Sequence, residues 1–329
     1  MKILNEKEKI DVVIPWVDGS DPVWQMKKNS YMNGASDSSD EMKSNNRFED
    51  YGTLKYLFRS IELCMPWVNN VFLVTDRQVP DWLDSTKVRV VDHTEFIDGK
   101  LPTFNSNVIV TSIYKIPGLS EKFILLNDDY VLWNMNNPED YFINDMPVDI
   151  LAETSIVPFQ DGFFHISQNG TAIVNKLFSK RFVMKKNLRK FFNLKYGLTQ
   201  VRTLLSLPYG GFVGFYNPHF AIAYRKSDFL SFEKIGLIEL KNTWANRFRE
   251  ATDINDWAVR YYRNIKGNFV PGKLRGLYTT LGDFKDPVKV SSKVKMLVVN
   301  DDSVRDEVAL HNLEKTLNDK FFKKSKYEI

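Results

Sequence analysis

The sequence predicts an α/β protein with a Rossmann-like, mostly parallel sheet flanked by helices and a basic helical insert. Short apolar runs rich in β-branched residues alternate with helical or turn segments, as in parallel α/β sheets. Most of these runs end in acidic or amide residues. A chain of 329 residues with 43% hydrophobic residues can also bury a large core. We therefore expect a ligand site beyond the carboxyl ends of the strands.

Five apolar runs are predicted to be buried strands. They lie at residues 10–17, 71–74, 88–91, 123–126 and 296–299. The first run stops at the turn Asp18-Gly19-Ser20-Asp21-Pro22, and the next two stop at Thr75-Asp76 and Asp92-His93. The last two both end in the tripeptide Asn-Asp-Asp.

Helical spacing of apolar residues is present between Leu54 and Leu63, and Pro66 ends that pattern. Further helices are predicted around residues 107–114 and 253–262, the last with Asp253 at its start. Residues 33–46 are rich in Ser, Asn, Asp and Gly and are predicted to form a mobile loop.

The middle of the chain is basic. Residues 162–227 contain eleven Lys and Arg but no Asp or Glu, although the whole chain has a net charge of only +4. We expect residues 1–160 and 211–329 to form the two parts of a catalytic domain, separated by a basic helical insert at 161–210. The basic face of this insert either lies against an anionic membrane or is a solvated face of helices that bury their phenylalanines.

Several classes of protein are disfavoured. The single cysteine, Cys64, permits no internal disulfide, and no apolar run approaches the roughly 20 residues that span a bilayer. The N-terminus has no signal-peptide pattern, so we expect a cytoplasmic location, with peripheral attachment to the inner face of the membrane if the insert binds lipid. Phosphate-loop, dinucleotide, Cys-x-x-Cys and His-Glu-x-x-His motifs are absent, and no recognised nucleic-acid module is present.

The remaining polar residues suit the transfer of a phosphorylated group. The adjacent carboxylates Asp128 and Asp129 would repel each other unless a cation, a hydrogen-bond network or solvent relieved them. A divalent cation and arginines such as Arg247 and Arg249 could neutralise a diphosphate. His219, in a turn after Asn217 and Pro218, is the best candidate for a general base, although a structural role is also open.

These motifs together resemble the Stealth family of bacterial capsular and cell-wall polysaccharide sugar-1-phosphate transferases, which includes N-acetylglucosamine-1-phosphotransferase. Residues 10–22 resemble its first conserved region. The later regions are matched in the family's order by residues 47–56, 59–62, 66–68, 74–76, 102–106, 126–129, 217–219, 247–249, 299–302 and 324–328. Tyr51-Gly52 and Tyr327 depart from the family's usual residues, and the basic insert is not covered by the resemblance.

The resemblance implies transfer of a hexose-1-phosphate from a UDP-sugar to a hydroxyl of a glycan or lipid-linked oligosaccharide acceptor, forming a phosphodiester and releasing UMP. Two other functions stay open: a glycosyltransferase that releases UDP, and a non-catalytic glycan- or lipid-binding assembly factor. The implied catalytic residues are His219, Asp128, Arg247 and Arg249. The implied ligands of Mg²⁺ or Mn²⁺ are Asp128, Asp129, Asp301 and Asp302, although the last two could simply cap the final strand. The implied substrate-binding residues are Asp18, Arg47, Glu49, Asp50, Asn105, Ser106 and Asn127.

Overall fold

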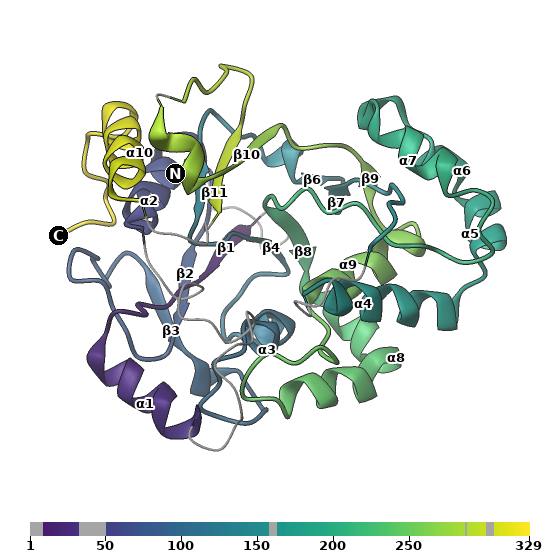
Figure 1. The fold of residues 1–329 in the computed structure, drawn as a ribbon, viewed down its shortest axis with the longest axis horizontal. Helices are drawn as coiled ribbons and strands as arrows, with labels where there is room; N and C mark the ends of the chain where they lie inside the picture. The colour runs from purple at the N-terminus through teal and green to yellow at the C-terminus, as the bar shows by residue number, and fades with distance from the viewer. Residues whose placement is uncertain (1–8, 33–50, 158–162, 287, 301–305) are drawn as a thin grey trace.

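A computed structural model describes residues 9–32, 51–157, 163–286, 288–300 and 306–329 (Figure 1). Its centre is a five-stranded sheet of order β3-β2-β1-β4-β8. The strands are β1 (Ile10–Pro15), β2 (Val71–Thr75), β3 (Arg89–Asp92), β4 (Lys122–Leu125) and β8 (Ile222–Arg225). The first four pair in parallel, and β8 runs antiparallel to β4 at the edge. The predicted mostly parallel α/β sheet is therefore confirmed.

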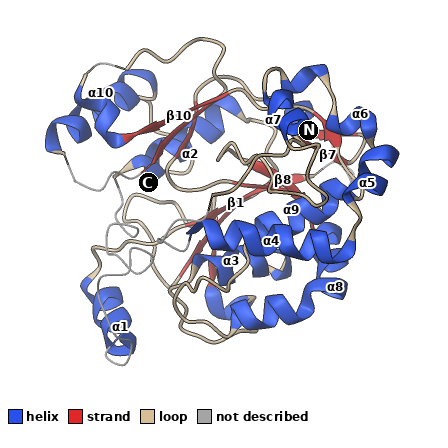
Figure 2. Ribbon diagram, turned by 45° about the vertical axis from the view of Figure 1, so that its right-hand side comes forward, coloured by secondary structure: helices blue, strands red, loops and turns tan. Residues whose placement is uncertain are grey.

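Helices cover both faces of this sheet. In β1, Val12 and Ile14 pack into one hydrophobic cluster with helices α2 (Thr53–Cys64) and α10 (Glu307–Lys320). Val13 points to the opposite face, where it joins a cluster with helices α3 (Ser106–Ser112), α8 (Lys226–Trp244) and α9 (Asp256–Ile265) (Figure 2). Burial on both faces explains why the central strands read as continuous apolar runs.

Two smaller sheets accompany the central one. The strand predicted at 296–299 is β11 (Met296–Asn300), which lies between β10 (Gly276–Thr280) and β5 (Tyr130–Leu132) in the order β10-β11-β5. Because β5 begins directly after Asp129, the chain turns at residues 127–129 and brings the end of β11 beside them. The third sheet comprises β6 (Phe142–Ile143), β7 (Met146–Asp149) and β9 (Val270–Pro271).

The basic middle segment is helical, as predicted. Its helices are α4 (Phe163–Leu177), α5 (Lys180–Lys186), α6 (Leu188–Phe191) and α7 (Thr199–Leu205). Helix α4 packs beside α9, and Ile173 of α4 joins the hydrophobic cluster on the Val13 face of the central sheet. The helices α5 to α7 lie at one edge of the molecule, opposite α10 and α1 (Pro22–Met32) (Figure 1).

One predicted boundary is wrong. The helix expected to begin at Asp253 begins at Asp256, because Asn255 caps it by accepting a hydrogen bond from the Trp257 amide at 3.2 Å. The Asp253 carboxylate instead accepts hydrogen bonds from Asn105 and Asn246, each at 2.7 Å. The loop predicted at residues 33–46 lies outside the described residues. Within the described ranges, no helix has the length and apolar character needed to cross a membrane.

Candidate active site

A cavity of about 610 Å³ lies at the carboxyl edge of the central sheet. Its walls come from the residues that follow β1, β2 and β4, from the starts of α3 and α9, from the 217–223 segment and from the end of β11. This is the edge where open α/β sheets usually bind their ligands.

The predicted site residues divide into three groups. Those that line the cavity are His219, Asn127, Asp128, Asp129, Ser106 and Arg249. Those that are described but lie off its walls are Asp18, Asn105 and Arg247. Those that lie outside the described residues are Arg47, Glu49, Asp50, Asp301 and Asp302.

Asn105 and Arg247 brace the loop that carries Arg249. The buried Asn105 caps α3 by accepting from the Asn107 amide at 3.0 Å, and it donates to the Phe248 carbonyl at 3.1 Å. The Arg247 guanidinium donates to the carbonyls of Leu101 and Pro102 at 3.0 and 2.8 Å. These contacts point Arg247 at backbone oxygens rather than at the cavity.

Arg249 is the arginine of this loop that reaches the cavity wall. Its Nη2 atom donates to the Ser106 hydroxyl at 2.6 Å, so it meets the first turn of α3. A guanidinium and a hydroxyl thus face the cavity together, and both can donate to phosphate oxygens.

Asp18 stabilises the turn after β1. Its carboxylate accepts from the Ser20 amide and hydroxyl at 2.8 and 2.6 Å. Its own amide donates to the Gln78 side chain at 3.0 Å. The side chain is therefore engaged in an Asx turn directly after the cavity-lining residues Trp16 and Val17.

Asp128 and Asp129 line the cavity and are held there by their backbone. The Asp128 carbonyl accepts from Thr53 at the start of α2 at 2.8 Å, and the Asp129 carbonyl accepts from the Val299 amide in β11 at 3.1 Å. Asn300 at the end of β11 lines the same cavity. This set of carboxylate and amide oxygens fits Mg²⁺ or Mn²⁺, which prefer oxygen ligands. Within the described ranges, no three His, Cys, Asp or Glu side chains form a metal-binding group.

His219 has an unusual backbone conformation. Its φ is 54°, in the left-handed region that costs a non-glycine residue about 1–2 kcal/mol. Its ring lies edge-on to Tyr130 and Tyr278, with centroids 5.9 and 5.5 Å away. Burial lowers the pKa of His219 below its usual 6.5, so the imidazole is neutral at physiological pH. The strained backbone at His219, with its positive φ, is typical of functional sites.

Sequence reasoning missed part of the cavity wall. Asp256 and Arg260 lie one helical turn apart on α9 and both face the cavity, a spacing that was visible in the predicted helix. Burial raises the pKa of Asp256 to about 6, although Tyr224 donates to it at 2.8 Å. Trp16, Trp24 and Phe104 also line the cavity as an aromatic wall, in which Trp24 packs edge-on to Phe104 with ring centroids 5.5 Å apart. Aromatic residues scattered along the chain carried no sequence signal for this wall.

The family models and the curated relatives of this chain agree on one family. Residues 8–36 and 47–149 match Stealth protein conserved regions 1 and 2. The capsular polysaccharide phosphotransferase WcwK of Streptococcus pneumoniae is 34% identical over 306 residues, 91% of each chain. The exopolysaccharide phosphotransferase cps2G of Lactiplantibacillus plantarum is 38% identical over 320 residues, 95% of this chain and 93% of that protein. The solved galactosyltransferase LgtC aligns with 96% of this chain and 98% of its own, with 11% identity and a TM-score of 0.43.

Proposed function

Because this chain belongs to the Stealth family, we propose that it is a polysaccharide phosphotransferase. It moves a hexose-1-phosphate from a UDP-sugar to a hydroxyl of a glycan or lipid-linked oligosaccharide acceptor. The products are a phosphodiester and UMP. The biological setting is the synthesis of a capsular or cell-wall polysaccharide.

The observation that carries this proposal is the convergence of three kinds of group on one cavity. A neutral imidazole at His219, two carboxylates at Asp128 and Asp129, and a guanidinium at Arg249 line the same cavity, although the histidine and the arginine follow the carboxylates by about 90 and 120 residues in sequence. A base, a cation-binding edge and a phosphate-binding group are the parts that phosphoryl transfer requires.

In the proposed reaction, the imidazole of His219 accepts the proton of the acceptor hydroxyl. The hydroxyl oxygen forms a bond to the phosphorus that carries the sugar, and the bond from this phosphorus to the bridging oxygen breaks. The electron pair leaves with UMP, and the sugar keeps its anomeric oxygen. Arg249 stabilises the phosphoryl oxygens as charge shifts toward the leaving group.

Asp128 and Asp129 are the described residues that would hold a divalent cation, with Asp301 and Asp302 as further proposed ligands. A bound Mg²⁺ or Mn²⁺ would supply charge neutralisation for the diphosphate. The aromatic wall of Trp16, Trp24 and Phe104 suits the nucleoside end of the donor, because bases bury well against aromatic rings. Asp18 borders this end through the turn after β1.

The fate of the β-phosphorus tests the proposal. A panel of UDP-sugars labelled with ³²P at the β-phosphate is incubated with the enzyme and the acceptor glycan. Phosphotransfer moves the label into the acceptor and releases unlabelled UMP. A glycosyltransferase would leave the label in UDP, and this result would refute the proposed reaction.

A matched variant links the product to the proposed base. His219→Ala should lose label transfer by at least about 100-fold, within the range that general base catalysis supplies. His311→Ala is the control, because His311 lies on α10 rather than on the cavity wall. A non-catalytic assembly factor would release no nucleotide in any of these reactions.

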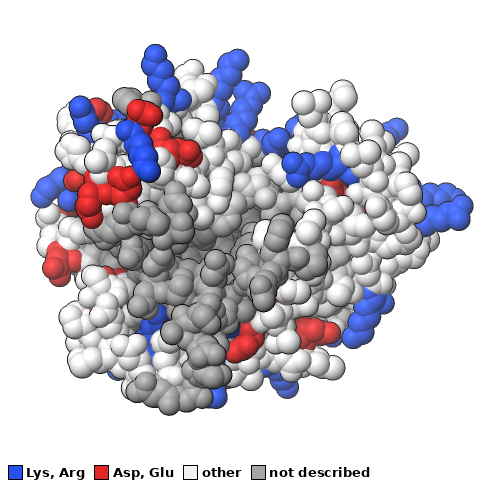
Figure 3. Space-filling view, in the orientation of Figure 1, with Lys and Arg blue, Asp and Glu red and all other residues white. Residues whose placement is uncertain are grey.

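We also propose a cytoplasmic location with peripheral attachment to the inner face of the membrane through α5 to α7. This surface exposes apolar side chains, including Leu194 at 93%, Leu198 at 88% and Phe182 at 69%. The neighbouring exposed charges are all basic: Arg181, Lys185, Lys186, Arg189, Lys195 and Arg202. Lys and Arg project from the corresponding edge in Figure 3, whereas acidic side chains of that face gather mainly on the opposite side. An anionic bilayer complements both properties.

A further inference from the structure

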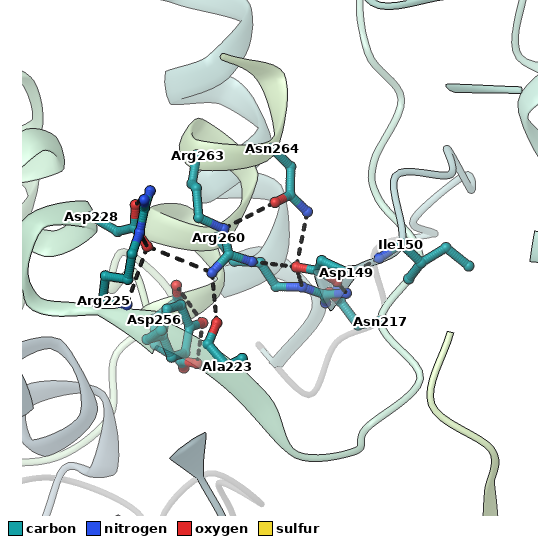
Figure 4. Close-up of polar contacts among 11 residues, drawn as sticks. Asp149, Ile150, Asn217, Ala223, Arg225, Asp228, Asp256, Arg260, Arg263 and Asn264 are labelled. Carbon is teal, nitrogen blue, oxygen red and sulfur yellow. Dashed lines mark hydrogen bonds and ion pairs between the residues drawn. The ribbon is translucent and has the colours of Figure 1, made fainter. Parts of the chain in front are cut away.

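A buried polar network connects the end of β7 with α9. The Asp149 carboxylate accepts two hydrogen bonds from Arg260, at 2.8 and 2.5 Å. It also accepts from Arg263 and, at 3.0 Å, from Asn264 (Figure 4). Burial alone would raise the pKa of Asp149, but the neighbouring Arg260 and Arg263 hold this pKa at about 2. The carboxylate therefore stays ionised and fixes both guanidinium groups.

This network reaches the turn that carries His219. The Nη1 atom of Arg260 donates to the Asn217 carbonyl oxygen Oδ1 at 2.6 Å (Figure 4). The amide nitrogen of Asn217 donates to the Tyr261 hydroxyl at 2.5 Å. Asn217 is thus clamped between two consecutive residues of α9, and only Pro218 separates it from His219.

The side chain of His219 has little else to orient it. The imidazole packs edge-to-face against the Tyr130 and Tyr278 rings, and no hydrogen bond to it is found in the part of the chain that the structure describes. Its backbone conformation, with φ of 54°, is one that a histidine does not favour by itself. The position of the imidazole therefore depends on how firmly the preceding residues are held.

We propose that Asp149, Arg260 and Asn217 form a positioning relay that holds the His219 turn in its reactive conformation. This inference rests on the proposed role of His219 as the general base. Asp149 fixes the guanidinium of Arg260, this guanidinium fixes the Asn217 side chain, and Asn217 fixes the start of the turn. None of the three residues needs to touch the substrate to have this effect.

Asn217→Ala breaks the relay at the turn. We expect kcat to fall by at least about 30-fold while the KM for the UDP-sugar changes less than about threefold, because a misplaced base slows the reaction without weakening donor binding. Asn217→Asp should retain kcat within about fivefold. The new carboxylate still accepts from Arg260, and the Tyr261 hydroxyl can donate to it.

Asn264→Ala is the matched control. It also removes a buried amide that donates to Asp149, but the other hydrogen bond of this side chain comes from Arg263 rather than from Arg260 or Asn217. We expect it to lower the melting temperature and to keep kcat within about threefold. Arg260→Lys is a second relay variant, and it retains the positive charge. It should lower kcat as Asn217→Ala does, because an ammonium group cannot make the bidentate contact with Asp149 and also donate to Asn217.

The outcomes separate this proposal from the proposed function. Equal kcat losses in Asn217→Ala and Asn264→Ala would overturn the relay, since both would then report only loss of structure. The relay would also be overturned if Arg260→Lys raised only the KM and Asn217→Ala had a normal kcat. Arg260 would then be a residue that binds the donor. If His219→Ala keeps its activity, the proposed base itself is wrong, whatever the relay variants do.

Discussion

The neutrality of His219 is a property of its surroundings rather than of histidine itself. Packing against Tyr130 and Tyr278 removes water from the ring, and this desolvation disfavours the imidazolium form. A group that must accept a proton gains from this environment, because its basic form is populated at physiological pH. The cost is a weaker base than an exposed imidazole.

The pH dependence of the reaction should show this shift. Because the pKa of His219 is lowered from 6.5, we expect kcat/KM to fall as the pH drops through a value below 6.5 and to be level between pH 7 and about 8. Asp256, with a pKa of about 6, could produce a similar limb. In Asp256→Asn the limb should persist if His219 is responsible. Its disappearance in that variant would assign it to Asp256.

Asp149 offers a prediction about stability. Asp149→Asn leaves two buried guanidinium groups, Arg260 and Arg263, without their shared carboxylate. Breaking a buried ion pair in this way typically costs about 3–5 kcal/mol in the free energy of unfolding. Urea denaturation at pH 7 measures the loss, and a change below about 1 kcal/mol would contradict it.

The same variant has a defined pH dependence. The pKa of Asp149 is about 2 in the folded protein and ordinarily 3.8, so its stabilising effect is complete above about pH 5 and is lost as the pH falls toward 2. The difference in unfolding free energy between the wild type and Asp149→Asn should therefore be smaller at pH 3 than at pH 7. An unchanged difference would show that the carboxylate charge is not what stabilises the fold.

At the scale of elements, the basic helices bury some of their aromatic side chains and expose others. Phe191 is fully buried, and Phe178 and Phe192 pack against the same cluster. Phe182 and several leucines instead face solvent. The helices are thus anchored through one face and present another that is both apolar and basic. Sequence periodicity could not separate these faces because α5 to α7 are short and change direction.

Vesicle binding tests this surface. Replacing Arg189, Lys195 and Arg202 by Gln should weaken binding to phosphatidylserine vesicles by roughly 100-fold, since each basic residue near an anionic surface contributes about 1 kcal/mol. The wild-type affinity should also fall as salt rises. Leu194→Ser with Leu198→Ser should weaken binding at all salt concentrations. Phe322→Ser, at an apolar position beside α10 that is 66% exposed, is the control and should bind normally.

A different result would favour a solvated surface. If binding to vesicles is absent, or is indifferent to salt and to lipid charge, α5 to α7 are not the membrane contact. Sedimentation with vesicles of graded phosphatidylserine content gives this answer directly.

For the whole molecule, the central strands could be predicted from the sequence, but the contacts between distant segments could not. The central strands were predictable because burial on both faces makes them continuous apolar runs. The meeting of Arg59 with Glu328, at 2.8 Å through two hydrogen bonds, was not predictable, because it joins residues 269 positions apart. Likewise β11 repeats the pattern of β4 but belongs to another sheet, which it reaches because β5 reverses the chain after Asp129.

For the candidate site, the residues could be predicted from the sequence better than their contacts could. The residues at strand ends, such as Asp128, and the turn residue His219 could be identified by type and position, and they do share a cavity. Asn105 and Arg247 also matched the family motif, yet neither lines the cavity: Asn105 donates to the backbone of the loop that carries Arg249, and Arg247 anchors this loop to the carbonyls of Leu101 and Pro102. A motif records that a residue is needed but not whether it binds substrate or holds a neighbour that does.

The proposed cation site makes a prediction for the molecule as a whole, since a ligand that binds only the folded state stabilises all of it. At 100 times its dissociation constant, such a ligand adds about 2.7 kcal/mol to the free energy of unfolding. We expect UDP-sugar with Mn²⁺ to raise the melting temperature by several degrees, and each one alone to raise it less. The diphosphate would supply oxygen ligands to the cation, and the cation would neutralise the diphosphate. The rise in melting temperature with both should therefore exceed the sum of the rises with each one alone.

Asp128→Asn and Asp129→Asn should remove this excess, because an amide oxygen replaces the charged ligand and leaves the diphosphate uncompensated. Asp319→Asn, an exposed carboxylate on α10, is the control and should keep it. Differential scanning fluorimetry measures the melting temperature of each variant with UDP-sugar and Mn²⁺, and samples with EDTA serve as the metal-free reference. A full thermal shift from UDP-sugar in EDTA would instead mean that Arg249 and its neighbours neutralise the diphosphate without a metal ion, and the two carboxylates would need another role.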